Sequence, residues 1–129
     1  MAWGNFVLDK GFVSDSVQTK FFAVKFAATE HVTAVTANTD EVAGFIQFGI
    51  STAELAQGKD ASVRVIGVTE AVATAAIAVG IWVTLEADGR VSPLVGASGK
   101  TVVGKCVGNP STNANDRISL LILPQRAKA

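Results

Sequence analysis

The chain is a succession of short runs of valine, isoleucine and alanine, separated by tight turns. The clearest turn is Asp88-Gly89, since Asp-Gly between two strand-like runs is a strong short-range signal of a β-hairpin, with Gly89 at positive φ. Gly67 and Gly104 lie inside other runs, where a glycine is typical of a bulge or a sharp bend of a barrel. The pattern predicts an all-β fold, a compact small β-barrel or sandwich.

The barrel-like domain is predicted to span residues 21–124. Its closing strand is Arg117–Leu123, which Pro124 should end, so that residues 125–129 form a polar tail. The sequence of this strand, RISLLIL, shows no clean alternation of apolar and polar residues. That pattern indicates burial on both faces, or one face buried against a partner.

A single helical turn is predicted over Thr52–Gln57. Ser51 or Thr52 would cap its beginning, and Gly58 would end it.

The first part of the chain concentrates the aromatic residues. Residues 1–26 hold six of the nine, and residues 1–20 show no regular periodicity, which predicts an extended N-terminal arm. Trp3, Phe6 and Phe12 lie on this arm, and aromatic side chains on an irregular segment usually dock into a surface. That surface is either the domain's own core or a neighbouring subunit. In the second case the three aromatics are partner-binding residues.

The composition restricts the classes of partner. Charged residues make up only 17% of the chain and hydrophobic residues 49%, so part of the apolar surface should be covered by a partner. The formal net charge is zero and no basic patch is evident, so nucleic acid is not an expected partner. The longest weakly polar stretch, residues 71–83, is too short to span a bilayer, and no membrane association is expected.

Residues that could perform chemistry are scarce. The chain has one histidine, His31, and one cysteine, Cys106, and its acidic residues show no metal-ligand spacing, so we expect neither catalysis nor a cofactor or metal. We expect His31 at the surface or hydrogen-bonded, Cys106 in the core, and residues 96–100 in a hairpin turn. Trp82, near Glu86 and Arg90, is the one candidate for a sugar-binding patch, but strand alternation suggests that Trp82 faces the core.

The order of these elements resembles the small capsid decoration (cement) proteins of tailed bacteriophages. The resemblance covers about residues 44–124 and rests on a strand ending in a Val-x-Val-x-Gly bend, an Ala-rich connection, an Asp-Gly-Arg-Val hairpin, a glycine-containing strand and a terminal apolar strand. These correspond to Val63–Gly67, Ala78–Val83, Asp88–Val91, Val103–Gly108 and Ile118–Leu123.

The resemblance implies a non-enzymatic virion protein, made in the host cytoplasm, that binds the outer surface of the capsid. Such proteins commonly form homotrimers and clamp neighbouring subunits of the major capsid protein against the pressure of packaged DNA. The second hypothesis is another β-rich phage structural or adhesive module, such as a tail, fibre or carbohydrate-binding domain.

Overall fold

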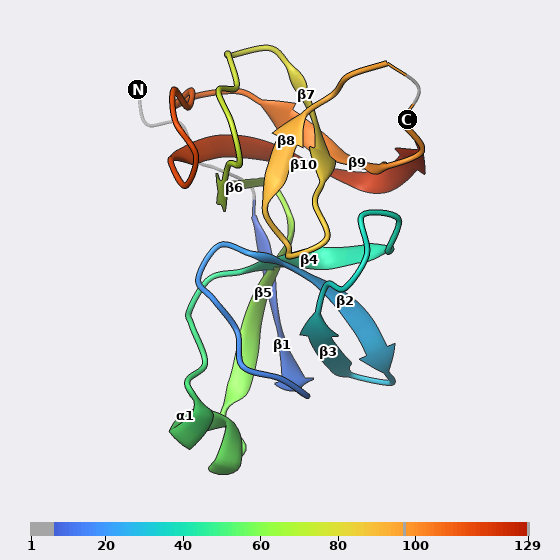
Figure 1. Ribbon diagram of the computed structural model, residues 1–129. Helices are drawn as coiled ribbons and strands as arrows, with labels where there is room; N and C mark the ends of the chain where they lie inside the picture. The colour runs from blue at the N-terminus through green and yellow to red at the C-terminus, as the bar shows by residue number, and fades with distance from the viewer. Residues whose placement is uncertain (1–6, 97, 129) are drawn as a thin grey trace.

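The computed structural model describes residues 7–96 and 98–128, with side chains through Leu123. Two β lobes lie one above the other in Figure 1, with the first five strands below and the last five above. The elements are β1 (Leu8–Ser14), β2 (Ala23–Ala28), β3 (His31–Ala34), β4 (Val42–Ile46), α1 (Thr52–Ala56), β5 (Asp60–Ile66), β6 (Val68–Val72), β7 (Trp82–Leu85), β8 (Val91–Pro93), β9 (Thr101–Cys106) and β10 (Arg117–Lys128).

The first lobe is a closed barrel with the strand order β1-β3-β2-β4-β5. Strand β1 closes it by pairing antiparallel with β5 and parallel with β3. Phe12, Ile46 and Val63 are among the residues that fill the interior. Closure leaves this lobe without a free strand edge, which is one way in which β proteins avoid uncontrolled association.

The second lobe is a five-stranded sheet with the order β6-β10-β9-β7-β8. One parallel bridge between Ala73, just after β6, and Val91 in β8 brings its two edge strands together. The prediction of an all-β fold with a barrel is therefore confirmed, and the predicted single barrel-like domain contains two distinct sheets.

The two lobes share one hydrophobic core. Phe45 of β4 and Ala23 of β2, both from the barrel, belong to the same buried cluster as Val83, Val91 and Leu120 of the second sheet. At the contact, the backbone N–H of Ala23 donates to the carbonyl of Gly89 over 2.9 Å. We therefore expect the lobes to unfold as one cooperative unit.

The Asp88-Gly89 hairpin joins β7 to β8, as predicted. The N–H of Gly89 donates to Glu86 O and the N–H of Glu86 donates to Arg90 O, and Gly89 has φ of 94°. A Cβ at Gly89 would lie 2.9 Å from Ala23 O in the barrel. The glycine thus permits both the turn and the contact between lobes.

Gly89→Val is expected to lower the free energy of unfolding by about 2 kcal/mol or more, because the positive φ and the close carbonyl both oppose a β-branched side chain. Gly58→Val is the matched control, since Gly58 also has positive φ, at 75°, but an added Cβ would meet nothing within 4 Å. Denaturant unfolding gives the loss in free energy of unfolding for both variants. The loss in Gly58→Val measures backbone strain alone, and the additional loss in Gly89→Val measures the clash with Ala23 O. Equal losses would show that the contact with Ala23 is unimportant.

The short helix agrees with its prediction. Ser51 is the N-cap of α1, and a capping box links its side chain and backbone to Glu54. Gln57 is the C-cap, and Gly58 follows in the left-handed conformation.

The predicted N-terminal arm requires correction. Leu8–Ser14, inside the range 1–20, is a full strand of the barrel, and Phe12 is only 6% exposed in the barrel interior. Its ring packs edge-on against that of Phe26 at 5.9 Å. Phe12 is therefore a core residue and not an exposed partner-binding residue, whereas Trp3 and Phe6 lie outside the described residues.

Both of the other predicted irregularities, at Gly67 and Gly104, are present, and they differ in form. Gly67 has φ of 110° and lies where the chain leaves β5 of the barrel and enters β6 of the second sheet, so it is a bend as expected. Gly104 lies within β9, and the pairing of β9 with β7 shifts register between Gly104 and Val102, so a bulge lies beside this glycine as expected. Its function is to allow the close approach of β10, because a Cβ there would be 2.1 Å from Leu121 O.

Two predictions about the last part of the chain were wrong. Strand β10 does not end at Pro124, because the backbone at Ala127 and Lys128 pairs again with β9 after a register shift. The predicted polar tail is therefore largely strand. Residues 96–100 do not form a hairpin, because the strands on either side of them, β8 and β9, are separated by β7.

Candidate binding surfaces

An apolar stripe crosses the outer face of the second sheet, the face directed away from its core. Val83 and Leu85 are fully buried in the core, so Trp82 lies on the opposite face of β7 and is 41% exposed. The prediction that Trp82 faces the core was therefore wrong. The polar residues Thr84 and Glu86 lie on the same face of the strand as Trp82. Their alternation with Val83 and Leu85 was the signal in the sequence that Trp82 faces outward.

The stripe is continuous across the strands because its residues are in register. Leu94 donates its N–H to Trp82 O, Trp82 pairs with Lys105, and Lys105 pairs with Leu121 of β10. Leu94, Trp82 and Leu121 are all exposed large hydrophobic residues. Val107, which donates its N–H to Ser119 O beside this row, is exposed as well. Such contiguous apolar area on a sheet face is typical of an interaction surface.

Lys105 lies within this stripe without a carboxylate partner among the described residues. Its Nζ is 5.3 Å from the centroid of the Trp82 ring, a cation–π contact worth about 0.5–1 kcal/mol at an exposed site. No local pattern singles out Lys105 or Leu121, since their proximity to Trp82 depends on pairing between distant strands.

A small pocket of about 160 Å³ lies on the same face, with Glu86, Ser92 and Lys100 among the residues that line it. Glu86 accepts hydrogen bonds of 2.6 Å from Lys100 Nζ and from Ser92 Oγ. Burial raises the pKa of Glu86, but these two hydrogen bonds and the charge of Lys100 outweigh burial and leave the pKa below its ordinary value. Glu86 is thus an ionised structural group that links Lys100 to Ser92.

The polar neighbours proposed for a sugar-binding patch are engaged elsewhere. Glu86 is bound to Lys100 and Ser92, while Arg90 donates to Asp88 and to Asn115. Trp82 is therefore flanked by apolar residues and Lys105, which favours a protein surface over a carbohydrate as its partner.

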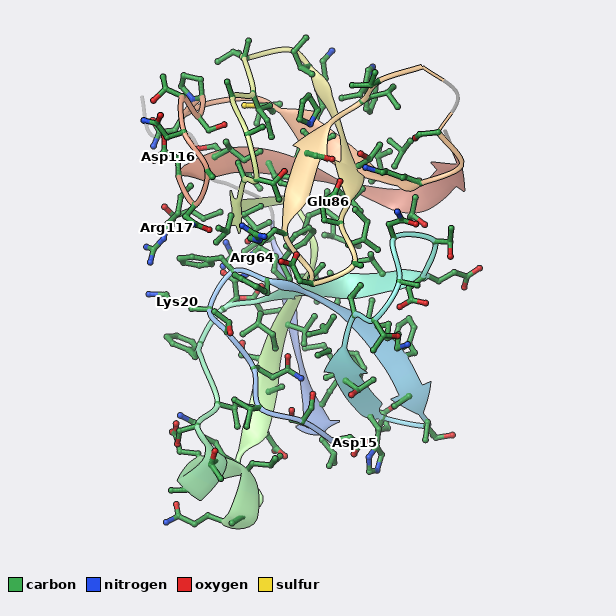
Figure 2. All side chains as sticks on the ribbon, in the orientation of Figure 1. Asp15, Lys20, Arg64, Glu86, Asp116 and Arg117 are labelled. Carbon is green, nitrogen blue, oxygen red and sulfur yellow. The ribbon has the colours of Figure 1, made fainter. Side chains whose placement is uncertain are left out.

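A second cluster lies where the two lobes meet, built on Phe21, which is only 7% exposed. Phe21, between β1 and β2, adopts φ of 66° and has Lys20 Nζ at 4.8 Å and the Arg117 guanidinium at 4.9 Å from its ring centroid. Figure 2 shows Lys20 and Arg117 on the same side of the molecule, at the level of the junction. Since Arg117 begins β10, this stack is a direct contact between the barrel and the second sheet.

His31 and Cys106 are far from any reactive arrangement. His31 Nδ1 lies 2.7 Å from Asp15 Oδ1 at the surface, as expected of a hydrogen-bonded surface histidine. Cys106 is buried in the core of the second sheet, as predicted. Within residues 7–96 and 98–128, no three His, Cys, Asp or Glu side chains are grouped to hold a metal, and no helix there is long and apolar enough to cross a membrane.

His31→Ala and Cys106→Ala are expected to leave partner binding unchanged. The first removes one exposed hydrogen bond to Asp15, worth about 0.5–1.5 kcal/mol, and the second leaves only a small cavity. Thermal melting would measure stability, and binding would be measured by co-sedimentation with the partner. Loss of binding in the folded His31 variant would show that the histidine takes part in function.

Comparisons with known proteins agree with this architecture. A family model described as phage cement protein matches residues 17–122. Among solved structures, the N base of head fiber gp8.5 in bacteriophage phi29 superposes with a TM-score of 0.67 at 13% identity, covering 96% of this chain and 100% of that one. At this identity the superposition shows a common fold. A search of curated proteins gave no match.

Proposed function

This chain belongs to the phage cement protein family, and on that premise we propose that it decorates the outer surface of the phage capsid and bridges neighbouring subunits of the major capsid protein, in the form of a homotrimer. As a member of this family it is a phage structural protein and a part of the virion. The proposal concerns the finer role, which is to hold the shell together without catalysis.

The observation that carries the proposal is the exposed apolar stripe of Leu94, Trp82 and Leu121 on a rigid sheet. A stable all-β unit that leaves such a surface open is suited to binding a partner by packing. On a capsid lattice, many weakly bound copies stabilise the shell, because each copy binds the assembled state alone. The protein would therefore act by holding the capsid shell together and not by catalysing a reaction.

Thermal disruption of capsids tests this role. Particles with and without bound protein would be heated at low salt and at about 1 M salt, where charge interactions are screened within about 3 Å. Because apolar packing dominates the proposed interface, decorated particles should survive to higher temperature under both conditions. Decoration that is removed by moderate salt, or that gives no protection, would contradict the cementing role.

Trp3 and Phe6 remain proposed partner contacts. The appropriate truncation removes residues 1–6, because a deletion through residue 17 would also remove β1 and open the barrel. Loss of two aromatic anchors should weaken capsid binding by more than about tenfold while the melting temperature changes little. Co-sedimentation with capsids measures this, and unchanged binding of the truncated protein would contradict an adhesive function for these two residues.

A further inference from the structure

Three positively charged side chains differ from the others because they have no carboxylate partner. Lys20, Lys105 and Arg117 form no ion pair within the part of the chain that the structure describes. Every other lysine and arginine with a described side chain is paired with an aspartate or a glutamate, and these are Lys10, Lys25, Lys59, Arg64, Arg90 and Lys100.

Each of the three cations lies over an aromatic ring. Lys105 lies over Trp82, whereas Lys20 and Arg117 share the ring of Phe21. A ring face attracts a cation without accepting its N–H groups as a carboxylate does, so the donors of these side chains remain available to a partner. The ring also restricts the movement of a long side chain, which lowers the entropy cost of ordering it when a partner binds.

The three cations lie on one side of the protein. Lys105 is within the apolar stripe, opposite Leu121 of β10. Arg117 is exposed on the same face of β10 as Leu121, since the alternate residues of this strand are buried in the core. Arg117 and Leu121 are four residues apart, which is about 13 Å along a strand. The ring of Phe21 then joins Arg117 to Lys20 at the junction of the lobes (Figure 2).

The carboxylates on this side leave the three cations unpaired. Glu86 is bound to Lys100, and Asp116 accepts hydrogen bonds from two backbone N–H groups of its own turn. Glu70 of β6 also points to the outer face, because both of its neighbours in the sequence are buried, and it has no ion pair among the described residues. Three unpaired cations therefore face outward with one unpaired carboxylate.

A partner that packs on the stripe must also accommodate Lys105. Because strand pairing places Lys105 between Trp82 and Leu121, a surface that covers those two residues covers the lysine as well. Removing its ammonium group from water without a new acceptor is strongly unfavourable. A partner surface with a carboxylate at that point supplies the acceptor, whereas a purely apolar or a basic surface does not.

We propose that Lys105, Arg117 and Lys20 are contacts for acidic side chains of the major capsid protein. The acidic groups lie at two points about 13 Å apart, one over Lys105 and the other over Arg117 and Lys20. This inference rests on the proposed capsid binding and adds to it the chemistry of the partner's surface. Apolar packing still provides most of the affinity, while these charges select the partner and orient the protein on it.

Charge reversal at the two points, measured by co-sedimentation with mature capsids, tests the proposal. Lys105→Glu and Lys20→Glu should each weaken capsid binding by about tenfold or more at low salt, because each places like charges in contact. At about 1 M salt the difference from the wild type should become smaller, since charge repulsion is screened. The neutral variants Lys105→Gln and Lys20→Gln, with a smaller loss in the same direction, replace any reversal that reduces the melting temperature.

Two further variants serve as controls. Lys59→Glu makes the same change of charge at the α1 end of the barrel, where Lys59 is paired with Glu54, and it should bind capsids as the wild type does (Figure 1). Glu70→Gln removes the unpaired carboxylate from the outer face. It should bind at least as tightly as the wild type, because the surface that it meets is acidic.

The outcomes separate this inference from the capsid role itself. A wild-type protein that binds no capsid would overturn the proposed function and this inference with it. Reversals at Lys105 and Lys20 that bind as well as Lys59→Glu, or weaker binding of Glu70→Gln, would overturn the inference alone. If the reversals kept capsid binding but changed the sedimentation coefficient of the free protein, the cations would contact a second copy of the chain instead.

Discussion

Replacing Phe45 by alanine is expected to reduce the free energy of unfolding by about 3–5 kcal/mol, the usual loss for a buried phenylalanine. Phe45 belongs to the barrel strand β4, yet it is fully buried in the core cluster that lies mainly within the second sheet. The cavity would therefore open between the lobes, where neither sheet can readily collapse onto it. Denaturant unfolding followed by tryptophan fluorescence and by far-UV circular dichroism measures the loss.

Phe48→Ala is the matched control for this substitution. Phe48 follows β4 but is 62% exposed, so its truncation should cost less than about 1 kcal/mol. Two separate transitions in the wild type, or equal losses for Phe45 and Phe48, would contradict a shared core. Coincident transitions by both probes are the expected result.

The second large effect is expected at Gly104, where alanine should cost about 3 kcal/mol or more. The added Cβ would lie 2.1 Å from the carbonyl oxygen of Leu121, a backbone atom in the middle of the β9–β10 ladder, so the two strands would have to separate.

Gly11→Ala provides the comparison, since Gly11 lies in β1 and an added Cβ would meet nothing within 4 Å. Its free energy of unfolding should stay within about 0.5 kcal/mol of the wild type. A Gly104 variant as stable as the Gly11 variant would show that β9 and β10 can adjust their separation at no cost.

The features that the sequence predicted correctly depend on short-range chemistry. The Asp88-Gly89 turn and the short helix, for which Ser51 was one of the two predicted caps, are determined by residues a few positions apart. Burial of Cys106 and the all-β class follow equally from local composition. The structure confirmed each of these.

The failures concern contacts between distant parts of the chain. The segment Leu8–Ser14 shows almost no alternation, because only Phe12 and Ser14 are buried, and it becomes a strand by pairing with β5 some fifty residues later. The orientation of Trp82 and the continuation of β10 beyond Pro124 likewise depend on partner strands. The binding surface was missed for the same reason, since strand pairing alone aligns Trp82, Lys105 and Leu121.

We propose, above all, that this protein binds the finished capsid lattice and holds it together. The most direct test mixes the purified chain with expanded, mature capsids and with unexpanded capsids of the phage that encodes it, and measures the bound protein after co-sedimentation. We expect saturable binding to expanded capsids and none to unexpanded ones, because only the expanded lattice would present the bridged sites. Equal binding to both forms, or binding to neither, would contradict it.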